Sequence, residues 1–439
     1  MKAAGTERLR AAWRSVVRSL LILATCILGQ GCRQQEDAFP PNKVFAKRLE
    51  LQQGVSVESA HKEVQLLLRA LFGTPNQPRW PAAIAAADGQ TPQSLVSLTR
   101  LERAAGAVRS NEEGVHWGLY REHCVACHGV AGNGLGPAAA LLNPYPRDFQ
   151  MGVFKWKRTP RGEKPTRDDL HRVLVRGVPG TAMPSFLHVD REDREALVDY
   201  TIYLAVRGEY ERRLLQWAVT EVDWEGGEHL LPRQLLDAAS GGEGAVAVES
   251  LDDELLRPLQ QILQQWRRAE EDPLLLAVGD APLPFSQDQE KALLSGAELF
   301  QGTVVGCAFC HGPDGKGAAQ VNNFDDWTRD YTVMAGINPL DAEQLAPLLE
   351  AGALKPRPAM PRNLTWGIYR GGDELVDLMA RITHGIDGTP MPSAPLQPQN
   401  PQGLNVEQLG DLVRFVRSLA GRDQGAGKGD WEPERGSMP

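Results

Sequence analysis

Two short cysteine strings carry the most evident chemistry in this chain. They are Cys124-Val125-Ala126-Cys127-His128 and Cys307-Ala308-Phe309-Cys310-His311. In a C-x-x-C-H string the two thiols can form thioethers with haem vinyl groups, and the adjacent histidine can bind the iron axially. A zinc site would need a second C-x-x-C or a histidine pair within the same module, and neither is present. The strings therefore predict two covalently attached haem c groups, with iron bound by His128 and His311.

A second recurring block offers the ligand for the opposite face of each iron. Met183 and Met391 both lie in the pattern G-T-x-M-P-S. Methionine usually packs in a core, but its repetition in the same block favours axial ligation here. Methionine opposite histidine raises the haem potential and suits reversible electron transfer. We therefore predict two His/Met iron sites.

The motifs occur in the same order twice, which indicates an internal repeat. Each C-x-x-C-H string is followed by a P-R-[DN] block, at Pro146 and at Pro361, and then by the methionine block. The stretch between the first two blocks is longer in the second copy: 18 residues separate His128 from Pro146, whereas 50 separate His311 from Pro361. The extra segment, roughly 321–358, is either a partner-contacting loop or a surface elaboration without a role.

Helical periodicity dominates the segments that must position these motifs, so we expect a mainly α fold. Helices are expected at 60–72, at 191–207, at 287–299 and at 406–419. Two tandem haem domains with a helical N-terminal extension and a helical linker follow from this pattern. The predicted ranges are 1–32 for an export leader, 38–109 for the extension, 110–212 for the first domain, 213–282 for the linker, 283–422 for the second domain and 423–439 for a flexible tail.

The N-terminus has the features of an export signal. Basic residues up to Arg18 precede an apolar run from Ser19 to Leu28, which is short for a membrane span. Gly31-Cys32 and a polar string follow, as at a bacterial lipoprotein cleavage site, although Gly29 and Gln30 depart from that pattern. We expect lipid attachment at Cys32 and a location on the periplasmic side of a bacterial membrane. The alternatives are ordinary cleavage of the leader or an uncleaved leader.

Charge argues against one class of partner. The 439 residues carry a net charge of −9, and no basic stripe follows the leader. We therefore expect no nucleic-acid partner.

The motifs together resemble the cytochrome c class I superfamily, and specifically its bacterial di-haem members with tandem domains. The resemblance covers about half of the chain and implies small helical bundles that each wrap one haem. It implies that the carbonyl of Pro137 orients His128, a contact for which the second domain has no matching proline. It also implies that Arg147 and Arg362 contact haem propionates.

The resemblance leaves two function classes open. The first is transfer of single electrons between a donor and an acceptor protein outside the cytoplasmic membrane, as a free carrier or as a subunit of a respiratory complex. The second is a di-haem peroxidase-like enzyme with one substrate-accessible haem. A methionine block in both domains favours the carrier over the enzyme, because a peroxidatic haem would lack a firm sixth ligand. The extension and the linker could in addition form a docking scaffold.

Overall fold

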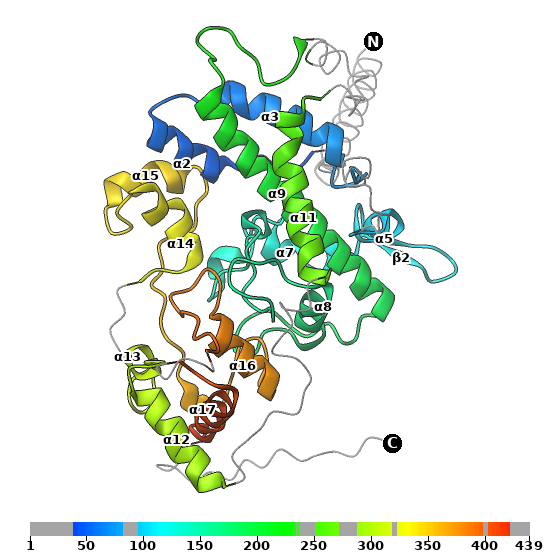
Figure 1. The fold of residues 1–439 in the computed structure, drawn as a ribbon. Coiled ribbons are helices and arrows are strands. Elements are labelled where there is room, and N and C mark those ends of the chain that lie inside the picture. Colours follow the sequence, from blue (N-terminus) through cyan, green and yellow to red (C-terminus); the bar gives the residue numbers. More distant parts are fainter. Residues whose placement is uncertain are drawn as a thin grey trace, which may run out of the picture.

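The computed structural model describes residues 38–81, 95–233, 236, 251–271, 288–317, 323–397 and 403–421. Over these residues the chain is mainly α-helical, as predicted, with one short hairpin of β1 (Arg109–Ser110) and β2 (His116–Trp117). Two helical bodies lie one above the other in Figure 1, with the second domain at the bottom. The predicted leader, Cys32 and the tail 423–439 lie outside the described residues, as do parts of the predicted linker.

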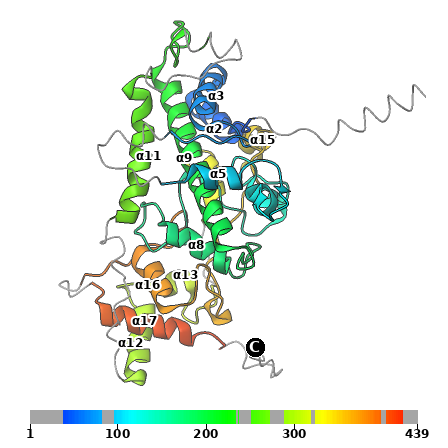
Figure 2. The same ribbon diagram turned by 90° about the vertical axis from the view of Figure 1, so that its right-hand side faces the viewer.

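The first body is built around one long helix, α9 (Arg191–Glu221). The sequence places its end near residue 207, but the helix continues because Tyr210, Leu214 and Leu215 are buried on its far half. The helices that pack against it include α3 (Glu58–Phe72) from the extension and α11 (Asp253–Glu271) from the linker (Figure 2). Extension, first domain and linker therefore share one hydrophobic core.

A buried ion pair within α9 also accepts a hydrogen bond from the extension. Glu211 is fully buried, pairs with Arg207 at 2.9 Å, and accepts a hydrogen bond from the backbone amide of Asn42. Asn42 in turn caps α2 (Lys43–Gln53) by accepting from the amide of Phe45. The smaller elements of this body are α5 (Leu98–Ala104), α6 (Leu119–His123), α7 (Val125–His128), η1 (Ala139–Leu141), η2 (Phe149–Met151) and α8 (Arg167–Arg176).

The second body has its own core between α12 (Gln289–Gln301) and α17 (Val406–Ser418). These helices cross closely at Gly296, where a Cβ atom would lie 2.3 Å from the carbonyl oxygen of Asp411. Phe300 and Phe415 pack beside the crossing, with ring centroids 5.4 Å apart. Its other helices are α13 (Cys307–His311), η5 (Leu364–Trp366) and α16 (Leu375–His384).

The extra segment of the second domain packs against the first body. It forms α14 (Asp326–Tyr331), η4 (Val333–Ala335) and α15 (Ala342–Glu350), which lie beside α2 in Figure 1. Trp327 and Leu348 share a small core with Val44 of α2 and Ala139 of η1. The buried apolar side chains of this segment therefore pack within the chain, whereas Val333, Met334 and Leu340 are exposed on its outer side.

Within the part of the chain that the structure describes, no helix is both long and apolar enough to span a bilayer.

Candidate haem sites

Each C-x-x-C-H string forms one short helix, α7 in the first domain and α13 in the second. All four cysteines are half-buried, and none of them is in a disulfide. Glycine follows each histidine, and Gly129 and Gly312 adopt φ values of 72° and 75°, a region open to glycine at little cost. The chain then folds back, since Gly134 donates to the carbonyl of His128 at 2.9 Å and Gly317 to that of His311 at 2.8 Å.

The two histidines are oriented by the same kind of contact. His128 Nδ1 donates to the backbone carbonyl of Arg147 at 3.0 Å, and His311 Nδ1 donates to that of Arg362 at 2.9 Å. Burial lowers the pKa of His128 to about 4 and also lowers the pKa of His311. Both rings are therefore neutral, with the proton on Nδ1, so the Nε2 lone pair is available for a metal.

This contact corrects the role predicted for Pro137. The orienting carbonyl belongs to Arg147. The segment after Pro146 is held near the histidine because the amide of Phe149 donates to the carbonyl of Gly132 at 2.7 Å. Pro137 itself is exposed. The second domain repeats the arrangement without a proline, as the amide of Leu364 bonds Gly315 at 2.7 Å.

The two methionine loops have matching internal hydrogen bonds. Thr181 Oγ1 donates to the carbonyl of Val178 at 2.7 Å and accepts from the amide of Met183 at 3.1 Å. Thr389 Oγ1 does the same with Ile386 and Met391, at 2.8 Å and 3.2 Å. Both methionines are half-buried. The repeated G-T-x-M-P-S block therefore folds into the same loop twice.

The side chain of Arg147, a predicted propionate contact, already has a protein anion as a partner. Its guanidinium pairs with Asp326 of α14, which also pairs with Lys155 at 2.7 Å. Burial acts to raise the pKa of Asp326, but the two cations outweigh it and hold the pKa at about 2. The sequence could not reveal this partner, because Asp326 is in the extra segment of the other domain.

The matching cations of the second domain, Arg362 and Arg370, form no ion pair with a carboxylate among the described residues. Arg362 donates to the carbonyl of Ile368 at 3.2 Å, and burial lowers its pKa. Burial and the charge of Arg362 lower the pKa of Arg370 to about 10. Both Nε atoms are buried and lack a hydrogen-bond partner among the described residues. Two neighbouring half-buried cations without an ion pair among the described residues fit the carboxylates of a haem, and Arg362 remains a candidate.

Arg370 is a further candidate that the motifs alone do not single out. It occupies the position of Lys155 in the repeat, so the shared basic residue nine positions after the proline was the available signal. Together with the neutral histidines and the paired cysteines, these residues fit two haem groups. His128 with Met183, and His311 with Met391, would supply the axial ligands.

Two family models match the chain, each over one of these sites. Residues 116–200 match a model described as cytochrome c oxidase, cbb3-type, subunit III, and residues 294–420 match one described as cytochrome c. No curated protein sequence matches. A chain from a reducing HAO-like protein complex of Kuenenia stuttgartiensis is similar over 71% of this chain and 97% of that chain, with 22% identity and a TM-score of 0.40.

The family matches define the class of both domains as c-type cytochrome. The chain therefore carries two cytochrome c domains, which imply two covalently attached haem c groups with iron and indicate haem-based electron transfer between redox partners.

Proposed function

We propose that this cytochrome transfers single electrons between a donor and an acceptor protein on the periplasmic side of a bacterial membrane. Each haem supplies a one-electron couple. The protein residues orient the axial ligands and partly bury each haem site. The two domains supply two haems through which an electron can pass in turn.

The observation that carries the proposal is the equivalence of the two sites. Each has a neutral histidine whose Nδ1 bonds a carbonyl, and each has a methionine loop with the same internal bonds. If Met183 and Met391 both bind iron, neither site keeps an open position for a substrate. This favours a carrier over a peroxidase-like enzyme.

Two further parts of the proposal rest on other observations. The match of residues 116–200 to a family described as an oxidase subunit supports a role as one subunit of a respiratory complex. The basic and apolar leader, with Cys32 after Gly31, supports export and lipid anchoring. Labelling with a fatty acid should mark the wild type and spare Cys32→Ala. Copurification after mild detergent extraction should recover the partner subunits.

The central test is the visible spectrum of the full chain. We expect a methionine–iron charge-transfer band that accounts for both haems. We also expect no carbon monoxide binding to the reduced protein while both methionine ligands are intact. Met183→His and Met391→His should each remove half of the band and lower the potential of one haem. A high-spin fraction, or carbon monoxide binding at one haem of the wild type, would instead support the peroxidase-like enzyme.

A further inference from the structure

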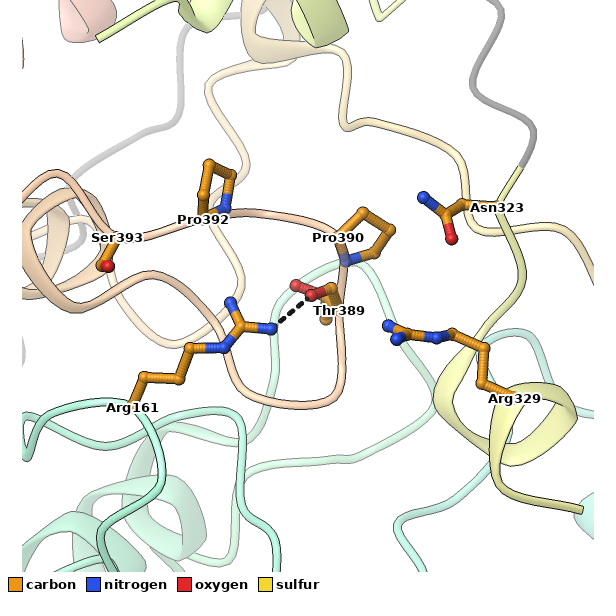
Figure 3. Close-up of a pocket in the computed structure, with 7 residues that line it drawn as sticks. All are labelled: Arg161, Asn323, Arg329, Thr389, Pro390, Pro392 and Ser393. Carbon is orange, nitrogen blue, oxygen red and sulfur yellow. Dashed lines mark hydrogen bonds between the residues drawn. The ribbon is translucent and has the colours of Figure 1, made fainter. Parts of the chain in front are cut away.

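The methionine loop of the second domain is bonded by residues of the first domain. Arg161 Nη1 donates to the carbonyl of Met391 at 2.7 Å, and its Nη2 donates to the carbonyl of Thr389 at 2.9 Å, the bond drawn in Figure 3. Both acceptors are backbone atoms on either side of Pro390. The two bonds of one planar guanidinium therefore restrain the backbone that carries the Met391 side chain.

A second contact anchors the same loop at Asp387, two residues before Thr389. The carboxylate of Asp387 accepts from the amide of Gly162 at 3.1 Å and pairs with Lys157 at 2.9 Å. Asp387 and Lys157 are both buried, whereas the Arg161 side chain is 39% exposed. The segment 157–162, which we call the clamp segment, thus contacts the loop at Asp387, Thr389 and Met391.

On the side that faces the cavity, the methionine loop has few packed neighbours that could hold it without the bonds to Arg161 and Gly162. Pro390 and Pro392 border a cavity of about 420 Å³ that is also lined by Arg161, Asn323 and Arg329 (Figure 3). Neither His311 nor Met391 lines this cavity. The loop therefore depends on hydrogen bonds where a packed neighbour is missing.

The first domain has no equivalent restraint. Its loop carries Pro179 where the second domain carries Asp387, so it lacks the anchoring carboxylate. Among the described residues, the hydrogen bonds of Val178–Ser185 stay within the first domain. Arg362 approaches this loop, since a Cβ at Gly180 would lie 3.0 Å from its Nη2, but no bond joins them.

We infer that Arg161 is a positioning residue for the axial methionine of the second haem, so that docking of the first domain sets the ligation of the second. The inference rests on the proposed function, in which Met391 binds iron. It makes the two sites unequal: contact between the domains stabilises the Met391–iron bond, and separation of the domains weakens it.

The test uses the full chain in a Met183→His background, where any methionine–iron band reports the second haem alone. Arg161→Ala should weaken this band, lower the potential of the second haem, and let imidazole bind the ferric protein about five to ten times more tightly, as expected for losing about one net hydrogen bond. Arg161→Lys should keep part of the band and of the potential that Arg161→Ala loses. Arg329→Ala, on the opposite wall of the cavity, should match the parent.

The outcomes separate the inference from the proposed function. If Arg161→Ala and Arg329→Ala both match the parent, or both change it equally, the clamp is refuted while Met391 keeps its role. If the Met183→His parent shows no methionine band at all, the axial role of Met391 fails and the clamp fails with it. Should Arg161→Ala not fold, Asp387→Asn tests the same restraint and should also tighten imidazole binding.

Discussion

Asp377 of α16 accepts a hydrogen bond of 2.7 Å from Arg176 of α8, across the boundary between the two haem domains. The carboxylate is 1% exposed, and Arg158 and Arg172 of the first domain also reach it, each at 3.3 Å. Three cations from one domain therefore surround one buried anion of the other. Arg381 adds a bond of 2.6 Å in the reverse direction, to the carbonyl of Lys157.

Removing this anion should weaken the contact between the domains. Asp377→Ala leaves three arginines facing each other, and we expect a loss of about 2 kcal/mol in unfolding free energy, less than for a fully buried pair because the arginines are partly exposed. Urea unfolding should show the second domain separating earlier. Asp168→Ala is the matched control, since its 70% exposed carboxylate pairs with Arg172 at the surface. Equal losses in both variants would contradict the assignment.

Asp326 should lower the potential of the first haem. It neutralises Arg147 and Lys155, and the carbonyl of Arg147 accepts the hydrogen bond from His128 Nδ1. Asp326→Asn leaves those cations uncompensated, which favours the reduced iron. We expect the potential of the first haem to rise by tens of millivolts while the second changes less, as measured by redox titration. A fall, or an equal shift at both haems, would contradict this prediction.

Asp148 should make stability fall as pH rises. Burial is the largest cause that raises its pKa, from 3.8 to about 8, with Asp330 adding to it and Arg212 opposing. The folded state thus keeps a proton that the unfolded state releases above about pH 4. The stability that the protonated Asp148 contributes is complete below that pH and is lost as the pH rises toward about 8.

Asp148→Asn should remove this pH dependence. The amide oxygen can still accept from the amide of Gln150, as Asn363 does from Thr365 in the second domain. We expect the variant to equal the wild type near pH 4 and to exceed it by about 1 kcal/mol or more at pH 8. Thermal unfolding across this range measures the difference. Parallel stability curves for the two proteins would show that Asp148 is ionised in the folded state.

Covalent haem content should follow the cysteines. Cys124→Ala and Cys307→Ala each remove one thioether, so each variant should lose part of the haem that stays bound after denaturation. Haem staining of a denaturing gel, normalised to protein, gives the ratio. The double variant should lose more than either single one, and full retention in all three would exclude these residues as attachment sites.

Much of this protein is determined locally by its sequence. The C-x-x-C-H strings, the P-R-[DN] blocks and the G-T-x-M-P-S blocks fold through bonds between residues near in sequence, such as Thr389 with Met391. For this reason a single sequence was enough to predict a mainly α fold and two haem c groups. The repeat likewise revealed the candidate axial methionines.

Contacts between distant segments were decided only by the tertiary structure. Asp326 meets Arg147, and Arg161 meets Met391, because the extra segment and the clamp segment cross from one domain to the other. Neither pair has a local pattern, since each depends on how two separate bodies dock. The sequence determined two similar haem sites, and the docking of the domains made their surroundings different, because buried charges are paired by whichever residue lies within a few ångströms.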